Sequence, residues 1–501
     1  MTTEQYIKEY QEWEMKISAY ELAITTMGFD TQTIAPEDGN EYRNSRDAYL
    51  SGVYFSLLTD DKFIKLLDEM ATLDDLPQDI AKAVHFRITD INKIRYIPQD
   101  VFVEYNKLMS DSYDVWAKAK KNNDYVSYAP YLKEMIEKSK NLFTYRKEDI
   151  HPYDMALDDY ELGMTREKYD DFFAKIKSEI VPLIKKVKDK QDEVDISFFS
   201  LDYSIAKQRE FMQCIMDYMG FDKKWGYLSE SPHPFSSMFS INDIRITTRY
   251  AEDSLVSGIF SIIHEIGHGT YSHQVNIKHD GTYLADNITS GMHESQSRLF
   301  ENYLGRTEAY WKTNYSKLQE LFPEQLQNVS LEKFTRAVNY SCPLLIRTEA
   351  DELTYPIHIY IRYELEKKIF DNEIDLDNLN NIWNDMYEEN LGIRADNDVE
   401  GIMQDVHWSG GSFGYFPTYA LGSAYAAQFM HTMRKQMDVD ECLATGNFKA
   451  VADWLKENIH QYGGFYTPEE ILVKTTGEPF NPQYYIDYLI DKYSRLYNIE
   501  K

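Results

Sequence analysis

Cysteine is scarce in this 501-residue chain, which holds only Cys214, Cys342 and Cys442. Their number is odd, they lie far apart, and no CxxC pair occurs. These features argue against a disulfide framework, thiol–disulfide exchange and a cysteine metal site. We therefore expect buried free thiols in a reducing compartment. The amino terminus also lacks a basic patch followed by an apolar run, the pattern of a secretion signal, so the expected location is the cytoplasm.

Long apolar runs and an excess of basic residues are missing as well. No stretch of about 18 uncharged apolar residues occurs, so the sequence predicts no membrane span. The chain has 53 Lys and Arg residues against 83 Asp and Glu residues, a formal net charge of −30 at pH 7. Because phosphate backbones and anionic lipid surfaces are bound by clustered basic side chains, we expect no nucleic-acid partner and no membrane partner.

Glycine and proline are too sparse for an all-β protein. The 22 Gly and 15 Pro residues cannot supply a turn every ~10 residues over the whole chain. Apolar residues instead recur three and four positions apart through residues 3–190, as at Phe63, Leu66 and Met70, which predicts amphipathic helices. Residues 244–247 alternate apolar and polar side chains and predict a strand. A mainly helical protein with little sheet is expected.

One predicted helix carries a metal-binding pattern. Residues 255–271 are apolar nearly all round, which indicates a buried helix, and they contain His264, Glu265 and His268 as an HExxH motif. The four-residue spacing places both imidazoles on one helical face, where they can bind Zn²⁺ beside a third protein ligand and a water. Glu265 can take the proton of that water. Chance would give roughly 0.02–0.03 such motifs in a chain of this kind, so two accidental core histidines are a poor explanation.

Two further candidates rest on spacing alone. Glu294 lies on the next predicted helix, near 293–305, and is the candidate third ligand, although a solvated carboxylate at a helix start fits the same position. Arg347 and Asp351 lie four apart and are by default an intrahelical ion pair.

The glycine-rich stretch 409–414 is flanked by His407, Tyr415 and Tyr419. Such a loop can close on a substrate and donate hydrogen bonds to an oxyanion. An ordinary connection between helices explains the same residues.

These motifs together resemble those of the carboxypeptidase Taq family of HExxH metallocarboxypeptidases. The family's motifs stand in order as HPF at 233–235, DxRxT at 243–247, HExxH at 264–268, an HES-type motif at 293–296, IRxxAD at 346–351 and GxxQDxHW at 401–408. One departure lies at 27–30, where Met-Gly-Phe-Asp replaces the family's more usual Trp-Asp.

The resemblance implies a nearly all-helical fold, similar to the angiotensin-converting-enzyme and neurolysin class. It implies one catalytic domain over residues 1–501, with a deep groove between two helical halves and a small β-sheet beside the HExxH helix. The implied activity is the release of single C-terminal amino acids from peptides with broad preference. The implied assembly is a homodimer.

The resemblance also implies roles for individual residues. His264, His268 and Glu294 would hold one divalent metal, for which Zn²⁺ is expected and Co²⁺ or Mn²⁺ would also fit. Glu265 would be the general base and later the proton donor. Arg347 and Arg245 would bind the substrate's terminal carboxylate. His407 and a tyrosine, with Tyr419 preferred over Tyr415, would stabilise the oxyanion. His233 would touch the substrate.

Two other functions compete with a carboxypeptidase. An endo-acting metallo-oligopeptidase of the same helical class would share the metal site but lack a clamp for the terminal carboxylate. An inactive peptide-binding scaffold would be expected to have lost Glu265 or a metal ligand, and the sequence retains all of them.

Overall fold

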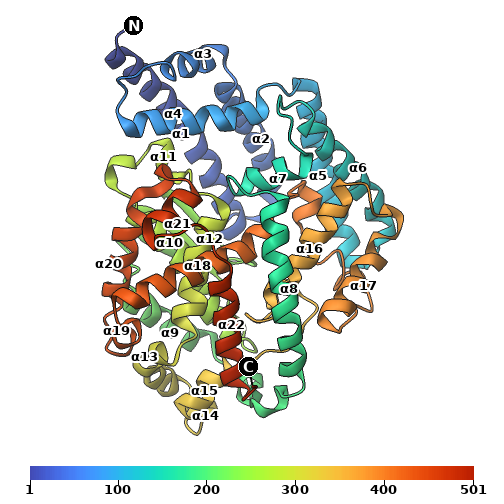
Figure 1. Ribbon diagram of the computed structural model, residues 1–501, viewed down its shortest axis with the longest axis vertical. Helices are drawn as coiled ribbons and strands as arrows, with labels where there is room; N and C mark the ends of the chain where they lie inside the picture. The colour runs from blue at the N-terminus through green and yellow to red at the C-terminus, as the bar shows by residue number, and fades with distance from the viewer. Residues whose placement is uncertain (501) are drawn as a thin grey trace.

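The computed structural model describes residues 1–500, and helices make up most of it (Figure 1). The chain begins with a group of helices at one end of the long axis: α1 (Thr3–Thr33), α2 (Asn40–Leu58), α3 (Asp61–Met70) and α4 (Gln78–Ile94). Two more helices follow along one side: α5 (Gln99–Asn122) and α6 (Tyr125–Phe143). Prolines stand at helix boundaries here, because Pro98 lies at the start of α5 and Pro36 lies between α1 and α2.

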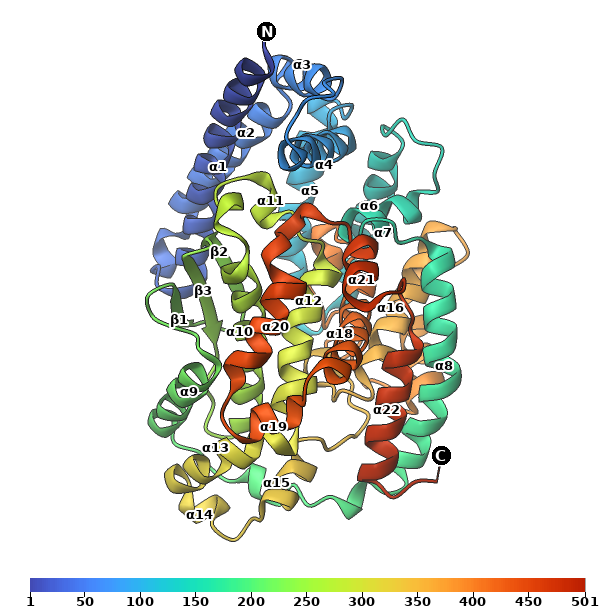
Figure 2. The same cartoon turned by 60° about the vertical axis from the view of Figure 1, so that its left-hand side comes forward.

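The rest of the chain forms the body of the molecule. Its first helices are α7 (Pro152–Tyr160), α8 (Arg166–Lys188), α9 (Ile205–Met219), α10 (Leu255–Gln274), α11 (Tyr283–Asp286), α12 (Ser290–Arg298), α13 (Glu308–Leu321), α14 (Pro323–Leu326) and α15 (Leu331–Ala337). The later ones are α16 (Tyr355–Phe370), α17 (Leu379–Leu391), α18 (Pro417–Gln436), α19 (Val439–Ala444), α20 (Phe448–Asn458), α21 (Pro468–Thr476) and α22 (Gln483–Leu496). The last helix, α22, lies along α8 in both views (Figures 1 and 2).

A three-stranded sheet lies beside α10 (Figure 2). Its strands are β1 (Gly226–Glu230), β2 (Ser236–Ser240) and β3 (Asp243–Thr248), in the order β1-β3-β2, with β1 parallel and β2 antiparallel to β3. Ile244 and Ile246 of β3 are fully buried, and Ile244 would touch a Cβ at Gly269 of α10. The strand predicted over 244–247 and the mainly helical class with a small sheet beside the HExxH helix are confirmed.

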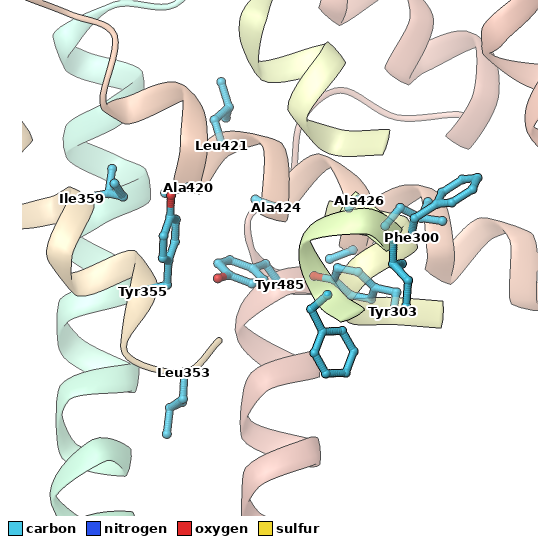
Figure 3. Packing of buried hydrophobic residues seen from close by; sticks show 14 of the residues in the cluster. Phe300, Tyr303, Leu353, Tyr355, Ile359, Ala420, Leu421, Ala424, Ala426 and Tyr485 are labelled. Atoms are coloured by element: carbon cyan, nitrogen blue, oxygen red, sulfur yellow. The ribbon is translucent and has the colours of Figure 1, made fainter. Parts of the chain in front are cut away.

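Buried apolar side chains form two clusters. The smaller joins α1, α3 and α4 with Leu284 of α11, and the larger runs through the rest of the chain from α5 to the last helix. Within the larger cluster, Tyr355, Ala424 and Tyr485 gather where α16, α18 and α22 meet (Figure 3). No helix in residues 1–500 is long and apolar enough to cross a membrane.

Two details differ from expectation. The three cysteines are free but partly exposed rather than buried. Residues 347–351 do not form a helical turn with an Arg347–Asp351 ion pair, because only a 3₁₀ turn, η6 (Arg347–Glu349), occurs there. Asp351 instead accepts hydrogen bonds from the backbone N–H groups of Leu353 and Thr354 just before α16, and Arg347 pairs with Asp405 from far along the chain.

Candidate metal centre

The candidate metal centre lies where α10, α12 and α18 pack closely together. A Cβ atom at Gly267 of α10 would stand 2.7 Å from the carbonyl oxygen of Gln296 on α12. A Cβ atom at Gly422 of α18 would stand 2.8 Å from the Cβ of Glu294 on the other side of α12. Only glycine allows approaches this short, so α12 is held between two helices with Glu294 facing α10.

His264, His268 and Glu294 converge as the sequence predicts. One ligand atom from each of the three lies within 4.8 Å of the others. The Nε2 atoms of His264 and His268 lie 3.5 Å and 3.3 Å from Oε2 of Glu294. Two imidazoles and one carboxylate are a donor set that suits a divalent transition metal with an open position. The residues present therefore fit the metal that the HExxH motif implies.

The outward nitrogen of each histidine is also fixed. Nδ1 of His264 lies 3.0 Å from Oε2 of Glu301, and Nδ1 of His268 lies 2.6 Å from Nδ1 of His293. The other nitrogen of His293 contacts the hydroxyl of Ser272 at 3.3 Å. Such contacts fix the ring orientation and leave Nε2 of both predicted ligands facing Glu294.

Arg298 joins the two carboxylates of this cluster. Its Nε donates to Glu294 at 2.7 Å and its Nη1 to Glu301 at 3.3 Å. Burial alone would raise the pKa of Glu294, but Arg298, His264 and His268 outweigh it and hold this pKa well below the ordinary value. Glu294 is therefore ionised at neutral pH, as a metal ligand must be.

Glu265 has the opposite electrostatic setting. Burial raises the pKa of its carboxyl group against the influence of His264 and His268. Its Oε2 atom is buried and has no hydrogen-bond partner within the protein, although such an atom ordinarily costs free energy when it is left unpaired. A carboxylate with a raised pKa and a free oxygen beside the ligand cluster is suited to accept a proton.

Arg347 belongs to a buried polar cluster. Its Nη2 and Nε atoms donate to Oδ1 of Asp405 at 2.8 Å and 3.1 Å, and its Nη1 donates to the hydroxyl of Tyr355 at 3.0 Å. The ring of Tyr355 lies under the guanidinium of Arg298, 4.3 Å from its Cζ. Tyr355 thus links Arg347 to the metal-ligand cluster.

His407, Tyr415 and Tyr419 are brought together. Nε2 of His407 lies 3.2 Å from the hydroxyl of Tyr419, and the two tyrosine rings are 5.2 Å apart. Burial lowers the pKa of His407 to about 4, so its imidazole is neutral at pH 7. Burial, with a contribution from the charge of Glu294, raises the pKa of both tyrosines, so their hydroxyl groups stay protonated and can donate.

The other two predicted site residues lie apart from this arrangement. Arg245 is on β3, where it donates to Asp243 at 3.0 Å and 2.8 Å and lies over the ring of Phe239, 3.9 Å from its centre. His233 is exposed in the β1–β2 connection. Within residues 1–500, neither side chain forms a hydrogen bond or ion pair with Arg347 or with the metal-ligand cluster.

Sequence reasoning missed four residues of the site, Arg298, Glu301, Tyr355 and Asp405. Arg298 had a usable signal, since it follows Glu294 by four positions and so lies on its helical face. Glu301 lies in the π-helical stretch Leu299–Gly305, where α-helical spacing does not apply. Asp405 stood inside a quoted motif without a role. Tyr355 had no signal in the sequence.

Comparison with known proteins identifies the same family as the motifs. A family model described as carboxypeptidase Taq (M32) metallopeptidase matches residues 9–493. Carboxypeptidase 1 of Bacillus subtilis is 41% identical over 494 residues, covering 98% of this chain and 99% of that protein. Thermostable carboxypeptidase 1 of Thermus thermophilus is 34% identical over 482 residues, covering 94% of each.

Solved structures of similar proteins match this fold over nearly the whole length of the chain. The crystal structure of an M32 carboxypeptidase from Deinococcus radiodurans matches with a TM-score of 0.96 at 32% identity, covering 99% of this chain and 100% of that one. Metallocarboxypeptidase 1 of Trypanosoma cruzi matches with a TM-score of 0.93 at 31% identity, covering 99% and 100%. This chain therefore belongs to the carboxypeptidase Taq family of metallocarboxypeptidases, as its motifs indicated.

Proposed function

We propose that the protein releases single amino acids from the free C-terminus of peptides with broad preference, and that its metal is Zn²⁺. The observation that carries this proposal is the convergence of His264, His268 and Glu294 beside the buried, unpaired oxygen of Glu265. A divalent cation bound there supplies Lewis-acid activation of water and of the peptide carbonyl. The same ligands also accept Co²⁺ or Mn²⁺, so metal analysis of the purified protein tests the choice.

Glu265 is proposed as the group that moves the proton. It accepts a proton from the attacking water as the oxygen bonds to the carbonyl carbon. It then passes that proton to the leaving amine as the C–N bond breaks. Burial supports both roles, because it raises the pKa of this carboxyl group toward the pH at which it works.

His407 and Tyr419, with Tyr415 as the alternative, are proposed to stabilise the oxyanion. The Tyr419 hydroxyl is protonated at neutral pH and lies next to the neutral His407. A fixed neutral donor of this kind favours the developing negative charge on the carbonyl oxygen.

Arg347 is proposed to bind the terminal carboxylate of the substrate. Three of its nitrogen atoms donate within the protein, to Asp405 and Tyr355, and these bonds fix the plane of a guanidinium that still has N–H groups to offer. Arg245 is the second proposed carboxylate contact and the exposed His233 a peripheral one. The family and the named relatives favour a carboxypeptidase over an endo-acting oligopeptidase with the same metal site.

Exchange of Glu265 for glutamine tests the mechanism. E265Q keeps the shape of the side chain but cannot accept a proton, so kcat should fall by roughly 100- to 10,000-fold while bound metal is retained. Amino-acid release and metal content are measured on the same preparation. Hydrolysis at the wild-type rate would refute the proton-transfer role.

A pair of matched peptides tests whether the protein is an exopeptidase. A peptide with a free C-terminus and its C-terminally amidated form are digested side by side, and mass spectrometry should show one residue lost per step from the free acid only. Equal cleavage of the amide would favour the endo-acting alternative.

Domain organisation, assembly and location are proposed as well. We infer one catalytic unit over the whole chain with the groove between two helical halves, and a homodimer, which light scattering on the purified protein tests. A cytoplasmic location is supported by the three free thiols.

A further inference from the structure

A polar stripe runs along a helix that is otherwise apolar. His358, Arg362 and Glu366 follow one another four positions apart on α16, and each is fully buried among isoleucine, tyrosine and leucine residues of the same helix. Buried charged groups are costly unless each has partners. Two partners of Arg362 and two partners of Glu366 lie in one segment, residues 404–414, which contains His407 and leads into Tyr415.

Glu366 binds this segment at two points. Its Oε1 accepts a hydrogen bond from Nε1 of Trp408 at 2.7 Å, and its Oε2 accepts one from the backbone N–H of Gly414 at 2.8 Å. Trp408 directly follows His407, and Gly414 directly precedes Tyr415. The carboxylate therefore ties together the two positions next to the proposed catalytic side chains.

The third partner of Glu366 lies outside the segment. The hydroxyl of Tyr153, on α7, donates to Oε2 at 2.9 Å. Gly414 is also fitted against α7, because its φ of +88° is left-handed and a Cβ there would stand 2.5 Å from the carbonyl oxygen of Ala156. The segment is thus held between α7 and α16 without room to shift.

Arg362 fixes the approach to the same segment. Its Nε donates to Oδ2 of Asp405 at 2.8 Å, and its Nη2 donates to Oε1 of Gln404 at 2.9 Å. The stripe on α16 therefore holds the segment both before His407 and after it. Of these contacts, those of Glu366 lie directly next to His407 and Tyr415 in the chain.

We propose that Glu366 is a positioning residue, which sets the relative placement of His407 and Tyr415 by binding Trp408 and Gly414 at once. This inference rests on the proposed function, because those side chains matter only if the protein hydrolyses peptides. Glu366 itself is buried and does not touch substrate. Its effect is on the geometry in which the transition state is bound, so its loss should lower kcat rather than raise KM.

The test compares three variants of the full-length enzyme. E366Q keeps the volume but loses one acceptor oxygen and places an amide N–H₂ among three donors. W408F removes only the indole donor from the segment. Y153F is the matched control, because it removes the donor from α7 and leaves both bonds to the segment intact.

We expect kcat to fall roughly 10- to 100-fold in E366Q, and less in W408F, with KM and metal content close to wild type. Y153F should keep its kcat. Hydrogen exchange followed by mass spectrometry should show faster exchange of peptides covering residues 407–416 in E366Q but not in Y153F.

The two readouts separate this inference from the proposed function. An unchanged exchange rate in folded E366Q and W408F overturns the positioning role, as does a wild-type kcat in both. If E366Q does not fold, W408F alone decides by the same two measurements. If wild-type enzyme releases no amino acid at all, the proposed function fails, while the exchange result still shows whether Glu366 holds the segment.

Discussion

At the scale of single residues, the residue just before the second histidine of the HExxH motif decides how closely helix α10 can approach α12. His264-Glu265-Ile266-Gly267-His268 needs a residue without a side chain at Gly267, because the backbone of α12 lies against that position. Alanine is the better helix former, so helix propensity alone would favour the substitution. Steric overlap with α12 opposes it and is the larger effect.

The exchange G267A should therefore destabilise the protein by about 1–3 kcal/mol, the usual result of overpacking. It should also weaken metal binding, because α12 must move and carries Glu294 with it. Urea unfolding and metal titration measure the two effects.

Gly52, within α2, supplies the matched control for that exchange. No atom lies within 4 Å of a Cβ built there. G52A should therefore stabilise the protein by about 0.5–1 kcal/mol, through helix propensity alone. A G267A variant as stable as wild type and with the same metal affinity would contradict the steric argument.

At the scale of elements, the start of α12 is capped by a residue from another part of the chain. Glu161, just after α7, is fully buried, and its Oε2 accepts the backbone N–H of Gly291 at 2.7 Å. A carboxylate at a helix N-terminus satisfies free N–H groups and favours the helix dipole. Burial nevertheless raises the pKa of Glu161 to about 7. The helix that carries Glu294 is therefore held by a group that titrates near neutral pH.

This raised pKa predicts the direction of a pH dependence. The stability that Glu161 contributes is complete below its unfolded pKa of about 4.5 and is lost as pH rises through about 7, because only the unfolded chain ionises the group freely. Tyr425, Tyr271 and Tyr169 face the same carboxyl group and stay neutral over this range.

Relative to E161Q, the wild-type free energy of unfolding should therefore fall between pH 4.5 and 7, by at most about 3 kcal/mol. Urea unfolding at several pH values measures the difference. Parallel curves for the two proteins would show that Glu161 does not titrate in this window.

The elements that the sequence predicts are those with local signals. Helix α10 follows from its apolar pattern, β3 from alternation, and the ligands His264 and His268 from their four-residue spacing. The default Arg347–Asp351 pair is wrong because a partner from far along the chain, Asp405, competes for the arginine. Such pairings depend on tertiary packing, which periodicity does not report.

The contacts that orient the metal ligands could not be predicted from the sequence for the same reason, because they also depend on tertiary packing. Glu301 lies in a π-helical stretch, Leu299–Gly305, that follows α12, and its partner His264 lies on a different helix. In the sequence, nothing distinguishes Glu366 from an ordinary charged residue of a helix. Its partners Trp408 and Gly414 lie more than 40 positions along the chain, so its contacts depend on tertiary packing.

At the scale of the whole molecule, the net charge of −30 governs how substrates approach. A net negative charge repels acidic peptides and attracts basic ones over distances set by the Debye length, about 10 Å at 0.1 M salt and about 3 Å at 1 M. The effect acts on association and not on the chemical step.

Two peptides of equal length with the same C-terminal residue, one acidic and one basic upstream, test this influence. At low ionic strength the acidic peptide should show the higher KM with a similar kcat, and the ratio of KM values should fall toward one as salt is added. A ratio independent of salt would locate the preference in direct contacts instead.

The close passage of α18 over Glu294 at Gly422 has a consequence for biosynthesis. The segments that supply all three metal ligands leave the ribosome long before the helix that presses the third one into place. A nascent chain would thus display the ligands without the enclosure that orders them. Hydrolytic competence should therefore arise only after α18 has been synthesised and has packed over α12.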